Sequence, residues 1–277
     1  MKKFLWILIV FIFVGCGKER TSEVFNLIEI PDLVLKNDSK VSLWGTEEFT
    51  SYSRMWLLGD TRNIKYVLIA LHGNDSLDFA SETKGDRDAL GGYLKSANEG
   101  AVLLHPVSTN EKWDPFYQNS VDHSVGFVKA FKQVEKAVGR SLFYQQFSLS
   151  GGGRVDRGLL KMLLKNYEKD STGLNIKEFV DRAILGVHSG ESTYNFAGDE
   201  IDLRIAFIEK FPRIKASFVH DDSGSEPKEM AKIGKHFVGD SFDINKEQKI
   251  LNGQVRFWKG TDHVNTWSGH FKQVFFE

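Results

Sequence analysis

The sequence predicts an α/β fold, in which a mostly parallel central sheet has helices on both faces and an antiparallel N-terminal edge. From Tyr66 onward, short runs of β-branched and aliphatic residues alternate with longer stretches of helical spacing. These apolar runs are continuous, which indicates strands of a parallel sheet that is buried on both faces. Before Tyr66, strand-like runs are separated by turn signals at 37–40 and 59–63, which indicates antiparallel strands.

The expected elements follow one another along the chain. N-terminal strands are expected at 24–30, 40–45 and 53–58. The strands of the parallel part are expected at 66–71, 101–105, 143–149, 182–187, 214–220 and 254–259. Helices are expected between them at 86–97, 121–138, 152–167, 202–210 and 228–236. Because ligands bind beyond the carboxyl ends of the strands in such sheets, functional residues are expected there.

The composition indicates one folded domain. Of the 277 residues, 41% are hydrophobic, which excludes a disordered or collagen-like chain. The 36 Lys and Arg residues nearly balance the 37 Asp and Glu residues, and no basic block is present, so nucleic acid is not expected as a partner. No linker or internal repeat follows residue 24, and we therefore expect a single domain at 24–277.

The N-terminus has the features of a secretion signal. Two lysines precede an apolar stretch at 4–14, which is too short to span a bilayer but typical of a signal peptide. Cys16, the only cysteine, follows it, so an internal disulfide is excluded. The segment resembles a bacterial lipoprotein signal. The resemblance implies a signal peptide at 1–15, a lipid on Cys16, a tether at 16–23 and anchoring to a membrane of the cell envelope; an uncut signal anchor is the alternative.

A candidate nucleophile stands where the strand expected at 143–149 meets the next helix. A strand that turns directly into a helix needs small residues two before and two after the apex of the turn. With Ser150 at the apex, these positions hold Ser148 and Gly152, whereas an apex at Ser148 would place the bulky Gln146 there. Ser150 is therefore the better candidate. The N-terminus of the following helix would stabilise a negative charge that develops beside it.

This segment resembles the nucleophile elbow of the α/β-hydrolase superfamily, G-x-S-x-G, with Ser148 in place of the first glycine. A phosphate-binding glycine turn is the alternative, but no Walker pattern is present. The resemblance implies an α/β-hydrolase fold and acyl transfer to Ser150. It also implies an oxyanion hole formed by the N–H of Gly151 and an N–H of Gly73 or Asn74.

The resemblance also implies the order serine, acid, histidine along the chain. His263 follows the last expected strand and is the candidate general base, because a histidine pKa near 6.5 suits proton transfer at neutral pH. His270 is the second choice. The acid is expected after the penultimate strand, where Asp222 is preferred and Asp221 and Glu226 remain alternatives.

The activity implied is that of a serine hydrolase of carboxylesterase type, without a cofactor or metal, acting on a small-molecule or polymeric ester. A serine peptidase or amidase of the same fold is the nearest alternative. A catalytically inactive ligand-binding envelope lipoprotein is another, because fold does not fix function. A penicillin-binding type of acyl transferase is suggested by S-x-x-K at 225–228, but its partner motifs are missing.

Histidines gather near the expected strand ends, which raises the question of a metal hydrolase. They are His72, His105, His188, His220 and His263. No metal-binding spacing such as H-E-x-x-H appears, so we do not expect a metal site. The side chain of His72 is expected to be a buried structural imidazole.

Overall fold

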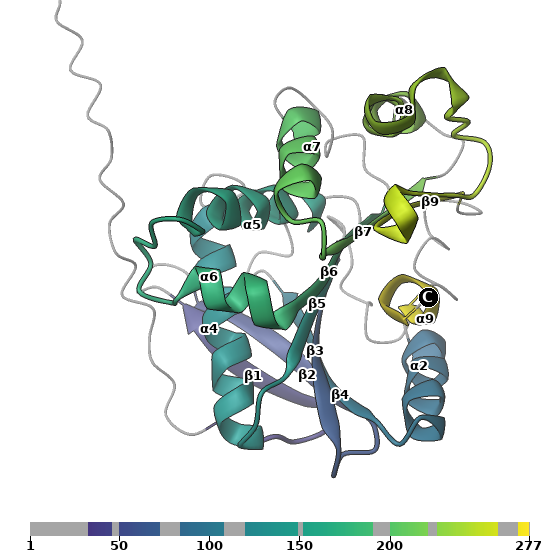
Figure 1. The fold of residues 1–277 in the computed structure, drawn as a ribbon. Coiled ribbons are helices and arrows are strands. Elements are labelled where there is room, and N and C mark those ends of the chain that lie inside the picture. The colour runs from purple at the N-terminus through teal and green to yellow at the C-terminus, as the bar shows by residue number, and fades with distance from the viewer. Residues whose placement is uncertain are drawn as a thin grey trace, which may run out of the picture.

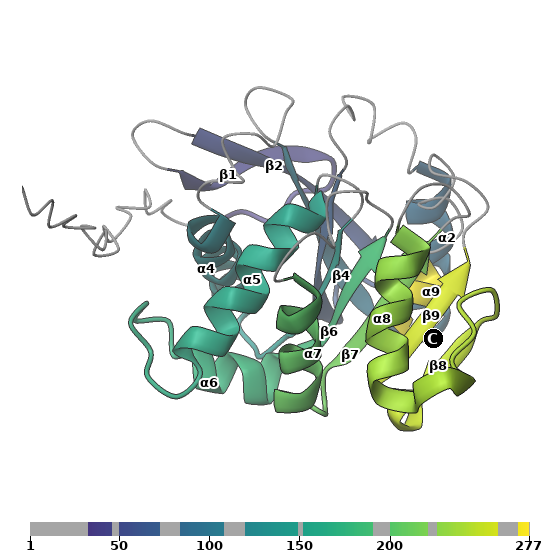
Figure 2. The same cartoon turned by 90° about the horizontal axis from the view of Figure 1, so that it is seen from above.

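The structure, a computed structural model, describes residues 33–45, 50–72, 84–107, 120–148, 152–190, 200–220, 226–259 and 271–276 (Figure 1). Its strands are β1 (Ser39–Gly45), β2 (Thr50–Gly59), β3 (Ile64–Leu71), β4 (Gly100–Val107), β5 (Phe143–Ser148), β6 (Ile184–Gly190), β7 (Lys215–His220), β8 (Gln248–Ile250) and β9 (Val255–Lys259). They form one nine-stranded sheet in the order β1-β2-β4-β3-β5-β6-β7-β9-β8. Figure 2 shows β1 and β2 at the opposite end of the sheet from β9.

The strand directions confirm the predicted fold class. Strands β4, β3, β5, β6, β7 and β9 are parallel to their neighbours in this series. Strand β1 is antiparallel to β2, and β2 is antiparallel to β4, which is the predicted antiparallel N-terminal edge. A register shift interrupts the pairing of β1 with β2 between Val41 and Trp44. At the other edge β8 is antiparallel to β9. Strand β8 was not predicted, because three residues are too few to show a pattern.

Helices cover both faces of the sheet, as predicted. They are α2 (Lys84–Ser96), α4 (Ser120–Val138), α5 (Gly152–Asn166), α6 (Ile176–Glu178), α7 (Glu200–Lys210), α8 (Glu226–Val238) and α9 (Phe271–Phe276). Figure 1 shows α4, α5 and α6 on one side of the sheet and α2 and α9 on the other. Alternate strand residues supply the two faces: Val67 and Ile69 pack with α4 and α5, whereas Leu68 and Ala70 pack with α2 and α9. A further group of buried apolar side chains joins α7 and α8 to β7 and β9.

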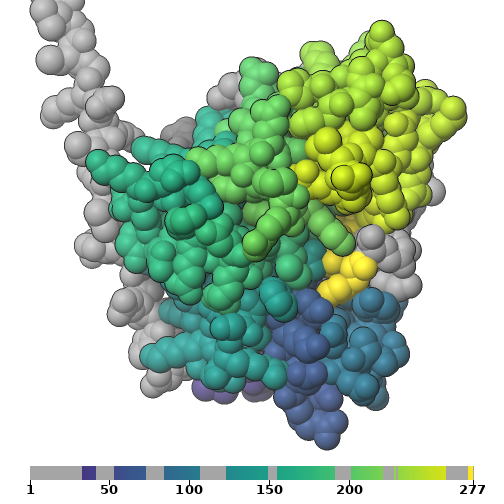
Figure 3. Space-filling model, in the orientation of Figure 1, coloured from purple at the N-terminus to yellow at the C-terminus, as the bar shows by residue number. Residues whose placement is uncertain are grey.

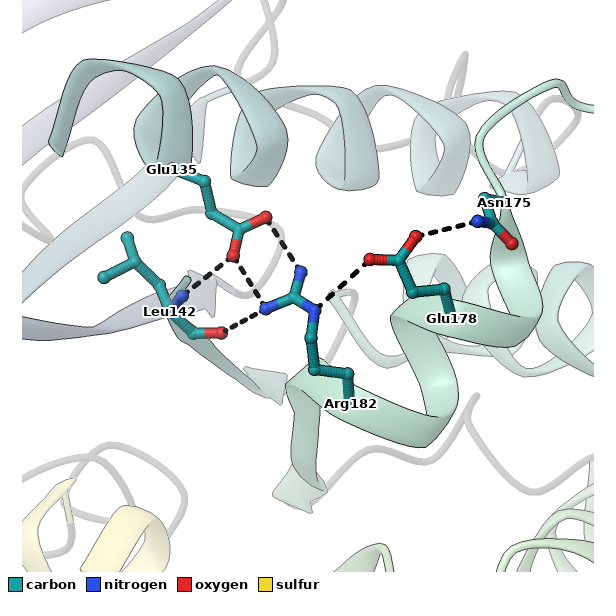
Figure 4. Close-up of polar contacts among 5 residues, drawn as sticks. All are labelled: Glu135, Leu142, Asn175, Glu178 and Arg182. Atoms are coloured by element: carbon teal, nitrogen blue, oxygen red, sulfur yellow. Dashed lines mark hydrogen bonds and ion pairs between the residues drawn. The ribbon is translucent and has the colours of Figure 1, made fainter. Parts of the chain in front are cut away.

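The strand predicted at 182–187 begins two residues later, at Ile184, because the segment before it is a π-helical turn (Phe179–Ala183). Arg182 therefore belongs to this turn, and its guanidinium contacts α4 (Figure 4). It donates to both carboxylate oxygens of Glu135, at 2.9 and 3.0 Å. The same carboxylate accepts a hydrogen bond from the backbone N–H of Leu142 at 2.8 Å. This cluster fixes the start of β5 and β6 against α4.

The segment before β1 lies outside the described residues. This holds for the predicted signal peptide at 1–15, the tether at 16–23 and the strand expected at 24–30. Within the part of the chain that the structure describes, no helix is long and apolar enough to cross a membrane.

Candidate active site

The residues predicted for catalysis, the oxyanion hole and lipidation lie outside the described residues: Ser150, His263, Asp222, Gly151, Gly73, Asn74 and Cys16. The alternatives His270 and Asp221 lie outside them too, whereas Glu226 is the first residue of α8. All these assignments stay predictions. What the structure describes are the strands and helices that lead into these segments.

The four strands that lead into the predicted site end along one edge of the sheet. Strands β3 and β5 end side by side, with Leu71 paired to Ser148. Ser148 is in turn paired with Ser189 of β6. Strands β7 and β9 end side by side, with His220 paired to Lys259. Because all these strands are parallel, the loops expected to carry the oxyanion hole, nucleophile, acid and base all begin at the same edge.

The strand and the helix that flank the predicted turn are both confirmed. Strand β5 ends at Ser148 and α5 begins at Gly152, so three residues separate them. A helix that starts here directs its positive dipole end and its unpaired N–H groups toward the carboxyl edge of the sheet. An anion that develops at this edge during a reaction would be stabilised there.

Ser148 itself is held within the sheet. It is buried, and its hydroxyl donates to the backbone carbonyl of His188 at 3.3 Å. Gln146, two residues earlier, is also buried and donates to Asp156 of α5 at 2.7 Å. Both observations agree with the preference for Ser150 over Ser148 as the apex, because the alternative nucleophile is enclosed.

A buried ion pair joins the first turns of α5 to α7. Asp156 of α5 is 0% exposed and Arg204 of α7 is 3% exposed, with 3.1 Å between Oδ2 and Nη2. Ser189 of β6 joins them, since its hydroxyl accepts from Arg204 at 2.7 Å and donates to Asp156 at 2.9 Å. Burial raises the pKa of Asp156, and the charge of Arg204 opposes this rise. The network fixes the first turns of α5 against β6 and α7.

Neither member of this ion pair was predicted from the sequence. A signal was present, because each charge stands on the apolar stripe of its helix. Asp156 precedes Leu159 and Leu160 at helical spacing, and Arg204 lies between Ile201 and Ile208 in the same way. Charged residues at such positions are buried only when they are paired.

Two buried histidines lie beside each other at the ends of β3 and β4. The centres of the His72 and His105 rings are 5.0 Å apart. His72 is buried, which confirms the prediction of a buried imidazole there. Burial is the main cause that holds the pKa of His105 well below its usual value, and the charge of a protonated His72 beside it acts in the same direction. The neutral His105 therefore donates from Nδ1 to the carbonyl of Ala70 at 2.8 Å. Within the described residues, no three His, Cys, Asp or Glu side chains group closely enough to hold a metal ion.

No protein-family model matches the chain, and no curated protein matches it. Among solved structures it is similar to Est1E from Butyrivibrio proteoclasticus, with 8% identity, a TM-score of 0.45 and coverage of 86% of this chain and 94% of that chain. It is also similar to a predicted CIB-like hydrolase from Thermoplasma acidophilum, with 14% identity, a TM-score of 0.45 and coverage of 88% and 95%. The fold class follows from this chain's own strand order and directions.

Proposed function

We propose that the protein is a serine hydrolase that cleaves carboxylic esters through an acyl-enzyme at Ser150. The observation that supports this most is the passage from β5 to α5 between Ser148 and Gly152. A turn this short, at the carboxyl edge of a parallel sheet and at the start of a long helix, is where a nucleophilic serine is exposed in folds of this type.

The proposed reaction begins when the hydroxyl of Ser150 attacks the ester carbonyl. His263 takes the proton from the hydroxyl and gives it to the departing alcohol, which leaves an acyl group on Ser150. Water activated by the same imidazole then releases the acid. Asp222 would orient the imidazole and stabilise its charged form. The parallel course of β5, β7 and β9 supports this set, because the three loops begin at one edge.

The oxyanion of the tetrahedral intermediate needs two donors. We assign them to the N–H of Gly151 and to an N–H of Gly73 or Asn74, since β3 and β5 are neighbours and end side by side. Loss of one such donor typically costs about 2.7 to 4 kcal/mol of transition-state stabilisation.

Labelling with a fluorophosphonate probe tests the proposal. The wild-type protein should be labelled, and Ser150→Ala should lose both labelling and ester turnover while it keeps its melting temperature. Ser148→Ala is the matched control, because its hydroxyl contacts His188 within the sheet, and it should still be labelled. A wild type that is never labelled, or a Ser150→Ala variant that still is, would overturn the mechanism.

Substrate class is tested separately. A panel of short and long nitrophenyl esters, beside aminopeptidase substrates, separates an esterase from a peptidase or amidase. Turnover of amides alone would contradict the ester assignment but keep the nucleophile. Absence of both labelling and turnover would favour an inactive binding protein of the same fold.

For the N-terminus we propose processing before Cys16, lipid attachment to this cysteine and anchoring in a bacterial cell envelope. The apolar stretch at 4–14 and the cysteine directly beyond it support this proposal. The following residues, to position 23, would act as the tether, and the domain would extend from residue 24.

A further inference from the structure

A cavity of 270 Å³ lies on the face of the sheet that α9 covers, near the amino ends of β7 and β9. Its lining residues are His188, Lys215, Ala216, Ser217, Lys249, Asn252, Gly253, Gln254, Arg256, Val274 and Phe275. Lys215 is the first residue of β7, and Gln254 directly precedes β9. The cavity is therefore separate from the proposed active site, which lies at the carboxyl ends of the strands. Figure 3 shows α9 (yellow) at the surface between the segment of β8 and β9 and α2 (blue).

The lining of the cavity is cationic. Lys215, Lys249 and Arg256 contribute three positive charges, and none of its described lining residues carries a carboxylate. Arg256 is held in place, because its guanidinium stacks 3.9 Å from the centre of the Trp258 ring and its Nε donates to Glu247 at 2.9 Å. Its side chain is only 13% exposed. Its Nη2 also contacts Glu247, whose carboxylate offsets part of the charge of Arg256, so the net positive charge of the lining comes chiefly from Lys215 and Lys249.

Two polar atoms of the lining residues are buried and have no hydrogen-bond partner within the described part of the chain. They are Nη1 of Arg256, a donor, and Nδ1 of His188. The other ring nitrogen of His188, Nε2, lies 3.1 Å from the carbonyl oxygen Oε1 of Gln145. Nε2 therefore carries the hydrogen, and Nδ1 is left as an acceptor. Buried polar groups in native proteins are nearly always paired, so both atoms point to a missing ligand.

The ring of His188 is fixed in this place. A side chain at Gly186 would overlap it, so the glycine leaves the room that the imidazole occupies. Gln145 donates from its Nε2 to the carbonyl of Phe275 at 2.7 Å, which ties the histidine's partner to α9. Burial, and then the charge of Lys215, lowers the pKa of His188 to about 3, so the ring is neutral and its lone pair is available.

We propose that this cavity binds a small oxyanion that carries an O–H group, such as hydrogen phosphate, a phosphate monoester with a free hydroxyl or a 2-hydroxycarboxylate. The three cations recognise the negative oxygens, with Nη1 of Arg256 as a hydrogen-bond donor. The hydroxyl donates to Nδ1 of His188. A volume of 270 Å³ is close to the lower end of the roughly 300 to 1,000 Å³ typical of small-molecule sites, which limits the ligand to a small molecule.

Calorimetric titration of the full chain at pH 7 and constant ionic strength tests the proposal. We expect at least one of three probes, inorganic phosphate, glycerol phosphate and lactate, to bind saturably. Which of them binds identifies the class of the oxyanion. Sulfate and acetate are the matched probes, because they carry no O–H hydrogen at this pH. We expect each to bind at least tenfold more weakly than its counterpart. Equal binding of sulfate and phosphate, with lactate no better than acetate, would overturn the role given to His188.

Variants locate the binding. Lys215 and Lys249 are both exposed, so the double variant Lys215→Met, Lys249→Met should fold normally and bind at least tenfold more weakly. Lys169→Met removes an exposed lysine from the loop after α5 and should bind like the wild type. Unchanged affinity in the double variant, or no saturable binding by any of the three oxyanions, would overturn the proposal. Ser150→Ala should bind normally, so failure here is distinct from failure of the proposed hydrolase.

Discussion

Replacing Arg204 by methionine should destabilise the protein strongly. The substitution keeps an apolar chain of similar length but removes the positive charge that the structure pairs with Asp156 among the described residues; Asp156 is fully buried. Asp156 would keep the hydrogen bonds from Gln146 and Ser189. Removal of one partner of a buried ion pair typically costs about 3 to 5 kcal/mol, because an uncompensated charge stays behind.

For a chain of this size, 1 kcal/mol corresponds to roughly 2 to 4 °C in melting temperature. The melting temperature of Arg204→Met should therefore fall by roughly 6 to 20 °C. Urea unfolding followed by tryptophan fluorescence gives the free energy directly, since the chain has 6 tryptophans. Lys84→Met is the matched control. Its pair with Asp88 has side chains that are 71% and 65% exposed, so the loss should stay below about 0.5 kcal/mol.

The deficit of Arg204→Met should also depend on pH. Burial already raises the pKa of Asp156 above its usual value of 3.8, and loss of Arg204 removes the charge that opposes the rise. A carboxyl whose pKa is higher in the folded than in the unfolded state destabilises the fold increasingly as the pH rises above the unfolded pKa. We therefore expect a larger deficit at pH 8 than at pH 5.

A double variant separates the lost charge balance from lost packing. Asp156→Asn combined with Arg204→Met leaves a neutral amide that still bonds to Gln146 and Ser189, so it should recover a large part of the loss. A deficit in Arg204→Met below about 1 kcal/mol, or one that is equal at pH 5 and pH 8, would refute the account of a buried pair that needs its counter-charge.

Three further predictions concern other parts of the molecule. His105→Asn keeps a hydrogen-bond donor near the Ala70 carbonyl. Because the pKa of His105 is held low in the fold, the wild type should lose about 1.4 kcal/mol of unfolding free energy per pH unit below pH 6.5 relative to this variant, as measured by urea unfolding. Gly234→Ala, in α8, should lower the free energy of unfolding by about 1 to 2 kcal/mol, because the new Cβ overlaps the packed ring of Phe242. Gly92→Ala has open space around it and should stabilise α2 by up to about 1 kcal/mol; thermal melts measure both effects. Cys16→Ala should move the protein from the membrane to the soluble fraction without a change in specific activity, and membrane retention of a processed variant would contradict the lipid anchor.

The sequence predicted the order of strands and helices because these elements depend on local patterns. The continuous apolar run of β3 and the stripe of α4 are examples, as is the start of α5 at Gly152, which was placed at the correct residue. It did not predict the strand β8 or the π-helical turn before β6. The first is too short for a pattern, and the second depends on contacts between Arg182 and Glu135, which are far apart in the sequence.

Some features of the candidate site could likewise be predicted from local sequence, whereas others depend on contacts between distant segments. A turn signal and a strand end fix where a nucleophile can stand, so Ser150 could be proposed from local residues. The pairing of Asp156 with Arg204, and the meeting of His188 with Arg256 at one cavity, depend on which strands become neighbours. The triad acid is the least determined from sequence, because Asp221, Asp222 and Glu226 all follow β7 within a few residues and local pattern does not choose among them.

Within the described part of the chain, both outermost strands of the sheet are poor templates for another polypeptide. Strand β8 offers three residues, and the pairing of β1 is interrupted by a register shift, which disturbs the regular row of backbone donors and acceptors that a foreign strand would need. Edge-to-edge growth into filaments is therefore discouraged at either rim. If copies of this protein associate, they should do so through side chains on helices or loops, and dilution should reverse the association.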